Sequence, residues 1–106
     1  MDEIITKNEI FNDGKTIHLY FNSMIGLYVA YGVSAFLLYK YAHITPSYSE
    51  EIQMPVAMIN AEHFKELGRK IGQFKNVSNY RCLAVNEQAD MDEYSEWANQ
   101  LRGCEA

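Results

Sequence analysis

The stretch TIHLYFNSMIGLYVAYGVSAFLLYKYA, residues 16–42, predicts two strands followed directly by a helix. Residues 16–24 are rich in β-branched and aromatic side chains that alternate between two faces, as in a half-buried strand. Residues 25–32 repeat this character after a short polar turn, so the two segments predict a hairpin. Residues 34–42 carry apolar side chains at helical spacing, and the Ser34 hydroxyl can serve as the N-cap of the helix.

The segments around this stretch are shorter and less regular. Residues 1–14 predict a short helix or a frayed arm at the N-terminus. Residues 44–51 contain Pro46 and several hydroxyl side chains and predict a loop or an edge segment, with a further short strand near Tyr48 left open. Residues 52–59 predict a strand. Pro55 within it indicates an edge position or an irregular step, because proline cannot donate a ladder hydrogen bond.

The C-terminal half predicts two helices on either side of a strand. Residues 61–74 have the period of an amphipathic helix, with the preceding asparagine as its N-cap. The apolar stripe of this helix consists of Phe64, Leu67, Ile71 and Phe74. Residues 80–87 predict a largely buried strand. Residues 90–106 predict a C-terminal helix that is capped by Asp90 or Asp92 and has acidic side chains in its first turn.

Together, three helices and at least four strands predict an α/β (α+β) fold, a mixed β-sheet flanked by helices. The chain has 106 residues, of which 48% are hydrophobic, and this suffices for one buried core. Residues 1–106 therefore predict a single domain.

Charge and cysteine content restrict the function classes. The formal net charge of −5 argues against an autonomous nucleic-acid-binding module, which normally presents a basic face to phosphate. No segment has the roughly 20 consecutive apolar residues of a membrane span, and the acidic N-terminus does not resemble a secretory signal. Cys82 and Cys104 lie far apart in the sequence, so we expect reduced thiols and a cytoplasmic protein.

The sequence contains no recognisable catalytic or metal-binding motif. His18, His43 and His63 are scattered over a strand, a loop and a helix, without the close spacing of a zinc site. The acidic residues 90–96 lack the glycine and the terminal glutamate of a calcium loop. No nucleophile elbow and no glycine-rich phosphate loop is present. We therefore expect no metal, no cofactor and no catalytic residue.

Tyrosine is the residue type in excess, with eight copies. They are Tyr20, Tyr28, Tyr31, Tyr39, Tyr41, Tyr48, Tyr80 and Tyr94. Tyrosines on strands can stack on nucleic-acid bases. They also pack between a sheet and its helices and at protein interfaces, where the hydroxyl reaches water. Because the sequence shows no basic surround, we favour packing or a protein interface over base stacking.

Three segments, in the same order along the chain, resemble the N-terminal domain (domain I) of the DNA mismatch repair protein MutS. GLYVAYGVSA (26–35) is similar to a glycine-rich and aromatic segment of that domain. IQMPVAMINAEHFKEL (52–67) is similar to a segment with isoleucine, proline and methionine, and YRCLAVNEQ (80–88) to a strand that ends in Glu-Gln. The resemblance spans residues 16–88 and implies a stand-alone MutS N-terminal-like domain, whose sheet is mixed and flanked by helices.

The resemblance also implies which residues would face DNA. In the family, a phenylalanine wedges beside the mismatched base, and a glutamate two residues later forms a hydrogen bond with that base. The matching positions here are Leu27 and Val29. Leucine can still wedge between bases, whereas valine has no hydrogen-bond acceptor. The resemblance thus makes Leu27 and Val29 the candidate DNA contacts, and we expect little or no preference for mismatches.

Two function classes follow. The first is a non-enzymatic, stand-alone MutS N-terminal-like domain that acts as a binding module for a protein partner or, weakly, for DNA. It accounts for the resemblance and for the missing catalytic motifs. The second is a small enzyme or ligand-binding domain with a tyrosine-lined pocket that contains Glu87 or His63. The sequence favours the first class and leaves the oligomeric state open.

Overall fold

A computed structural model of the chain describes residues 2–71, 74–77 and 80–105. Along this part of the chain, the elements are α1 (Asp2–Ile10), β1 (Thr16–Asn22), β2 (Leu27–Tyr31), α2 (Gly32–Ala42), β3 (Ser47–Ser49), β4 (Met54–Ile59), α3 (Ala61–Ile71), β5 (Phe74–Val77), β6 (Tyr80–Ala84) and α4 (Met91–Glu105). The N-terminal segment is thus a helix rather than a frayed arm, and the short strand near Tyr48 is present.

The strands form one sheet in the order β3-β4-β2-β1-β6-β5. The predicted hairpin lies at its centre, where Tyr20 pairs with Val29 and Phe21 with Tyr28. The predicted α+β fold, a sheet flanked by helices, is confirmed. Every described strand pairing is antiparallel. The sequence had predicted a mixed sheet, so this detail of the prediction is corrected.

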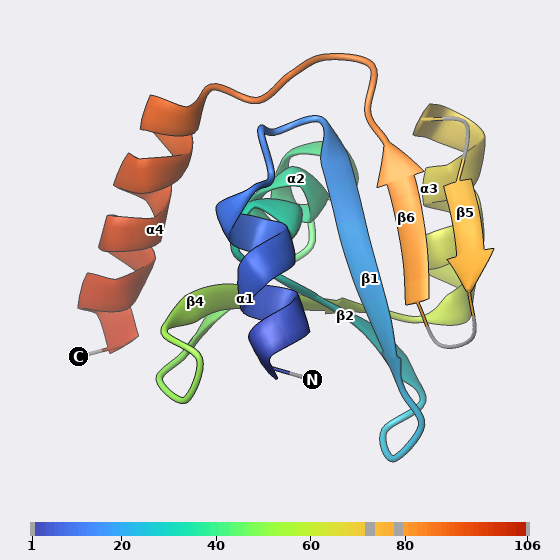
Figure 1. Ribbon diagram of the computed structural model, residues 1–106, viewed down its shortest axis with the longest axis horizontal. Helices are drawn as coiled ribbons and strands as arrows, with labels where there is room; N and C mark the ends of the chain where they lie inside the picture. Colours follow the sequence, from blue (N-terminus) through green and yellow to red (C-terminus); the bar gives the residue numbers. More distant parts are fainter. Residues whose placement is uncertain (1, 72–73, 78–79, 106) are drawn as a thin grey trace.

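The sheet is strongly twisted and wraps around α2 in the middle of the molecule (Figure 1). α2 packs against β1, β2 and β4, and residues 32–38 of this helix are all buried. A helix that is apolar on every side is typical of a core position. α1 lies in front of α2, α3 lies behind β6, and α4 stands beside β3 and β4 (Figure 1).

The core joins α2 to the sheet and to α3. Its fully enclosed side chains come from β1, β2, α2, β4, α3 and β6, and they are Ile17, Leu19, Ala30, Val33, Ala35, Leu37, Leu38, Ala57, Ile59, Leu67 and Leu83. Leu67 and half-buried Phe64 confirm part of the predicted stripe of α3. Phe74 does not continue that stripe, because the helix ends at Ile71 and Phe74 begins β5. The side chain of Ile71 lies outside the described residues.

Two predicted helix caps are confirmed. Asn60 Oδ1 accepts a hydrogen bond from His63 N at 2.8 Å and so caps α3. Asp90 Oδ1 accepts a hydrogen bond from Asp92 N at 2.9 Å and caps α4. Both side chains satisfy backbone donors that the first turn of a helix leaves without a partner.

The structure corrects two local predictions. Pro55 does not mark the edge of the sheet, because β4 lies between β3 and β2, and the prolyl residue pairs with Tyr48. Ser34 is not the N-cap of α2, because the helix begins at Gly32 and has no side-chain cap. Gly32 adopts φ +55°, a left-handed conformation that lets the chain turn directly from β2 into α2.

Candidate functional site

Charged residues are distributed unevenly along the chain. Residues 61–85, which span α3, β5 and β6, carry five Lys or Arg and two Glu, a net formal charge of +3. The rest of the chain carries four Lys or Arg and twelve Asp or Glu, a net formal charge of −8. The overall charge of −5 therefore conceals one basic part of the molecule, toward which an anionic ligand would be attracted.

Tyr28 on β2 is the centre of an aromatic cluster beside this basic part. Its ring stacks on Phe64 of α3, with centroids 4.8 Å apart, and meets Phe21 of β1 at 5.2 Å. The guanidinium carbon of Arg81 on β6 lies 5.8 Å from the Tyr28 centroid, within the range of a cation–π contact. We call Phe21, Tyr28, Phe64 and Arg81, together with Lys65 and Arg69 of α3, the aromatic–cationic surface.

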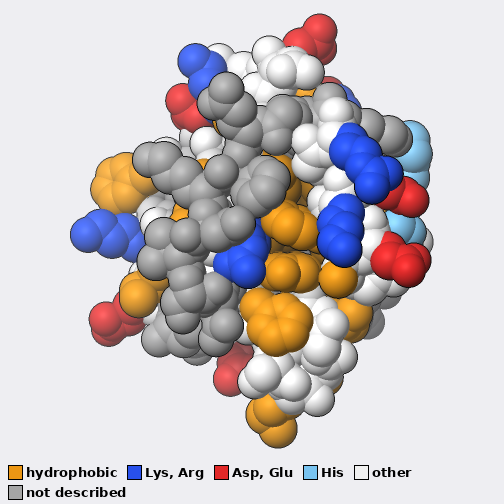
Figure 2. Space-filling model, turned by 90° about the vertical axis from the view of Figure 1, so that its right-hand side faces the viewer, with side chains coloured by type: hydrophobic (Ala, Val, Ile, Leu, Met, Phe, Trp, Pro, Cys, Tyr) orange, Lys and Arg blue, Asp and Glu red, His pale blue; other side chains and the backbone are white. Residues whose placement is uncertain are grey.

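The aromatic–cationic surface is partly open to solvent. Figure 2 shows an apolar strip with Lys and Arg side chains on both sides of it. Along α3, a shallow hollow of about 290 Å³ is lined by Phe64, Lys65, Gly68 and Arg69. Phe64 is half-buried, whereas Lys65 and Arg69 are exposed, so one ligand can reach both aromatic carbon and positive charge.

Segments far apart in the sequence build this surface. The hairpin register places Phe21 directly opposite Tyr28, and the pairing of β6 with β1 brings Arg81 within reach across β1. Phe64 precedes buried Leu67 by three residues, so both lie on the face of α3 that is turned toward the sheet. The rings are therefore held by the same contacts that close the core.

Leu27 and Val29, the positions that the MutS resemblance aligns with base-reading residues, flank Tyr28 on β2. Val29 is only 5% exposed, so its side chain belongs to the packed interior, and Leu27 is half-buried. Because side chains alternate along a strand, both residues point to the opposite face from Tyr28. The aromatic–cationic surface therefore does not include the predicted DNA contacts.

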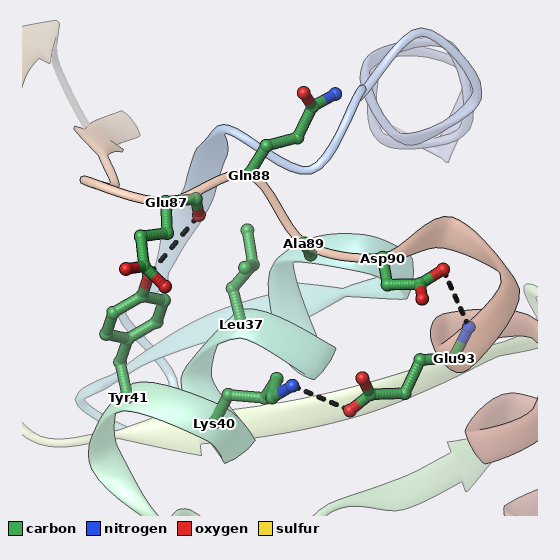
Figure 3. Close-up of a pocket in the computed structure, with 8 residues that line it drawn as sticks. All are labelled: Leu37, Lys40, Tyr41, Glu87, Gln88, Ala89, Asp90 and Glu93. Atoms are coloured by element: carbon green, nitrogen blue, oxygen red, sulfur yellow. Dashed lines mark hydrogen bonds and ion pairs between the residues drawn. The ribbon is translucent and has the colours of Figure 1, made fainter.

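A second candidate site is a pocket of about 370 Å³ between α2, the β6–α4 connection and the start of α4 (Figure 3). It is lined by Leu37, Lys40, Tyr41, Glu87, Gln88, Ala89, Asp90 and Glu93. Lys40 Nζ lies 2.6 Å from Glu93 Oε1, and the Tyr41 hydroxyl donates a hydrogen bond to the Glu87 carbonyl oxygen at 3.3 Å. With one lysine among three carboxylates, the pocket is negatively charged and favours a cationic ligand.

This pocket matches the second function class only in part. Tyr41 and Glu87 line it, whereas His63 lies in the first turn of α3. The Lys40 amine pairs with a carboxylate, and the Asp90 carboxylate caps α4, so both groups already have structural roles.

A third group of polar side chains is buried between α1, β1 and α2. Glu9 is 5% exposed, and its Oε1 accepts a hydrogen bond from Ser34 N at 3.0 Å. Its Oε2 accepts a hydrogen bond from the Ser34 hydroxyl at 2.6 Å. Burial raises the pKa of Glu9 from 4.5 to about 7, although hydrogen bonds from Ser34 and Asn12 act in the opposite direction.

Next to Glu9, a histidine and two tyrosines join α1, β1 and β6. His18 Nδ1 and the Tyr80 hydroxyl form a hydrogen bond, and Tyr20 accepts one from Asn8 Nδ2 at 2.7 Å. Burial lowers the pKa of His18 and raises the pKa values of Tyr20 and Tyr80, so all three side chains are neutral at pH 7. The contacts tie these elements together.

The sequence interpretation missed the aromatic–cationic surface. Phe21, Phe64 and Arg81 come from three segments, and no motif connects them. The signal that could have indicated the surface is the concentration of five Lys or Arg residues within residues 61–85. In the described residues, no three His, Cys, Asp or Glu side chains gather into a metal site. No helix in that part of the chain has both the length and the hydropathy that a bilayer span requires.

No protein-family model matches the chain, and the comparisons with curated proteins and with solved structures find no match. The resemblance to the MutS N-terminal domain therefore stays a prediction.

Proposed function

We propose that the protein is a non-enzymatic binding module whose aromatic–cationic surface binds single-stranded nucleic acid. The observation that carries this proposal is the contact of the Tyr28 ring with both Phe64 and Arg81, beside the basic part of the chain. Bases stack on aromatic rings and on guanidinium planes, and Lys and Arg side chains bind phosphates. Both kinds of group are present on this surface.

The shape of the surface favours unpaired bases over a duplex. Its rings are half-buried in a sheet and beside a helix, so a base must present its flat face to reach them. In a duplex these faces are stacked on neighbouring base pairs, and only the edges are accessible in the grooves. The acidic remainder of the molecule repels the backbone beyond the surface, so we expect a short footprint and strong salt dependence.

The MutS resemblance points to the same ligand class by a separate argument, although it places the DNA contacts at Leu27 and Val29 on the other face of β2. A cytoplasmic location, with Cys82 and Cys104 as thiols, is part of the proposal. An acidic protein surface is the other ligand that three exposed or half-buried cations could bind, and the experiment below distinguishes the two.

The proposal is tested with two double variants that change the net charge equally. Lys65→Glu/Arg69→Glu reverses the charge of the surface, whereas Lys7→Glu/Arg102→Glu reverses two exposed cations elsewhere. Fluorescence anisotropy measures binding of a labelled 15-nucleotide oligo-dT and of a mixed-sequence RNA at 50 mM salt. We expect at least tenfold weaker binding for the surface variant and less than threefold change for the control.

Equal effects of the two double variants would contradict the site, because they would show a response to net charge alone. Absence of binding by the native chain to both oligonucleotides at 50 mM salt would contradict the proposal. Crosslinking in a native lysate, with and without nuclease, then tests the alternative ligand, an acidic protein surface. A partner that persists after nuclease treatment and is lost in the surface variant is an acidic protein.

The pocket of Figure 3 supports a second candidate function, the binding of a small molecule with a positively charged group. Its carboxylates surround an apolar floor at Leu37 and the ring of Tyr41. A thermal shift with spermidine or arginine amide tests this candidate. We expect stabilisation of the native chain and a loss of that stabilisation in Glu87→Gln. Stabilisation that Glu87→Gln retains would place the ligand elsewhere.

A further inference from the structure

The turn between β1 and β2 presents two large apolar side chains to solvent. Met24 is 94% exposed and Ile25 is 52% exposed, whereas glycine and small polar residues are usual at such a tip. The turn projects from the body of the molecule at the lower right of Figure 1. A Cβ atom added to Gly26 would meet no atom of another segment within 4 Å. Neither apolar side chain of the turn therefore serves the core.

Hydrogen bonds hold this turn in one conformation. The Asn22 carbonyl oxygen accepts hydrogen bonds from Ile25 N at 3.3 Å and from Gly26 N at 2.8 Å. The Asn22 side-chain Oδ1 accepts a third hydrogen bond from Met24 N at 3.0 Å. Gly26 has φ +68°, a left-handed conformation that glycine adopts without strain. A ligand therefore meets the two apolar side chains on a preformed support, and the backbone loses little conformational entropy on binding.

The turn continues the aromatic–cationic surface. Asn22 and Leu27, the last pair of the hairpin, follow directly on the pair of Phe21 and Tyr28. Because a strand rises by about 3.3 Å per residue, the tip of the turn lies roughly 10 Å beyond these two rings. Residues 16–39 contain no Asp, Glu, Lys or Arg, although the whole chain has a net charge of −5. The hairpin thus places no carboxylate against phosphates, and one nucleic acid can reach from Tyr28 to the turn.

We propose that Met24 and Ile25 pack on the flat face of the last base pair of a duplex, at the end from which the bound single strand departs. This inference rests on the proposed function and specifies its ligand. Inside a duplex each base pair is stacked on both sides, and only the terminal pair leaves one face open. Methionine and isoleucine are among the apolar side chains that proteins pack against base faces. The ligand class is therefore a duplex with a single-stranded tail.

Fluorescence anisotropy at one salt concentration compares a 15-nucleotide oligo-dT, a blunt duplex, and the same duplex with that oligo-dT as its tail. We expect the native chain to bind the tailed duplex about fivefold more tightly than oligo-dT, and the blunt duplex most weakly. Met24→Ser/Ile25→Ser should abolish this preference and change the affinity for oligo-dT by less than about twofold. Ile4→Ser/Met91→Ser removes the same two residue types at exposed positions on α1 and α4, and should retain the preference.

The methyl resonance of Met24 provides a direct measurement in the native chain. The ring currents of a base pair shift a methyl group on its face upfield, so the ¹³C-labelled Met24 methyl should move upfield with the tailed duplex. The Met91 methyl on α4 should stay in place.

Three results would overturn the contact with the duplex end. They are equal affinity of the native chain for oligo-dT and the tailed duplex, a preference that Met24→Ser/Ile25→Ser retains or that it loses together with oligo-dT binding, and a Met24 methyl that moves no further with the tailed duplex than with oligo-dT. Each leaves oligo-dT binding by the native chain, and so the proposed function, intact. Absence of oligo-dT binding would instead overturn the proposed function and this inference with it.

Discussion

The guanidinium carbon of Arg81 lies 5.8 Å from the ring centroid of Tyr28, although β1 separates the strands that carry these two residues. The contact brings a positive charge from the basic part of the chain onto an aromatic ring from the central hairpin. Under the proposed function, this contact places a ring for base stacking beside a cation for phosphate binding.

The Arg81→Ala variant should reduce the salt dependence of oligo-dT binding. Loss of one phosphate contact lowers the slope of log K against log salt concentration by about 0.7 for a single strand. Anisotropy titrations between 50 and 200 mM salt measure this slope. Arg102→Ala, which removes an exposed cation from α4, serves as the control. An unchanged slope in Arg81→Ala, or an equal drop in both variants, would show that Arg81 does not contact the ligand.

Protonation of Glu9 should make the native chain more stable in mildly acidic solution than at pH 8. Below pH 4.5 the carboxyl is protonated in the folded and the unfolded state. As the pH rises from 4.5 to about 7, the unfolded chain loses the proton first, so stability falls by roughly 3 kcal/mol and then levels off. Urea unfolding across pH 5 to 8 measures the difference between the native chain and Glu9→Gln. A difference that does not vary with pH would contradict the raised pKa.

Truncation of Leu67 should destabilise the protein strongly. Its side chain is 2% exposed and packs in the core between α3 and the sheet, so Leu67→Ala should cost about 2–5 kcal/mol of unfolding free energy. Urea denaturation measures this cost. Ile4→Ala, on the exposed side of α1 where the side chain is 59% accessible, should change stability by less than about 0.5 kcal/mol. Similar costs at the two positions would argue against the orientation of α3.

Alanine substitution should have opposite effects at two glycines. Gly32 has φ +55° and its added Cβ would press on Glu9, so Gly32→Ala should destabilise the protein by at least about 1 kcal/mol. Gly103 lies inside α4 with open space around it, so Gly103→Ala should stabilise by about 0.5–1 kcal/mol. Thermal unfolding measures both changes, and a stabilising Gly32→Ala would contradict the close approach of α1 to α2.

A duplex containing a mismatch should bind no better than a matched duplex. Leu27 and Val29 provide no hydrogen-bond acceptor in their side chains, and Val29 is buried. Competition titrations at low salt with matched and mismatched duplexes of equal length test this expectation. A tenfold preference for the mismatch, about 1.4 kcal/mol, would show that the chain discriminates by another route.

Local patterns in the sequence were sufficient for most of the elements. The alternation in residues 16–24, the helical spacing in residues 34–42, and the caps at Asn60 and Asp90 depend on neighbours a few residues away, and all four are found in the structure. β5 was not predicted, because Phe74 fitted the stripe of the preceding helix and residues 75–77 showed no strand pattern.

The tertiary contacts between elements could not be predicted from local sequence patterns. A serine hydroxyl such as that of Ser34 has the same local preference for an N-cap wherever it precedes a helix. Only the packing of α1 against α2 brings the buried Glu9 carboxyl close enough to accept the hydrogen bond of this hydroxyl. Arg81 likewise meets Tyr28 because β6 pairs with β1, and a local pattern does not encode which strands pair.

The amino-acid pattern by itself therefore determined most of the secondary structure and the presence of one apolar core, because hydrophobic periodicity acts over short separations. The antiparallel strand order, the aromatic–cationic surface and the burial of Glu9 arose only on folding. Each depends on long-range packing, which desolvates some groups and brings others together from separate segments.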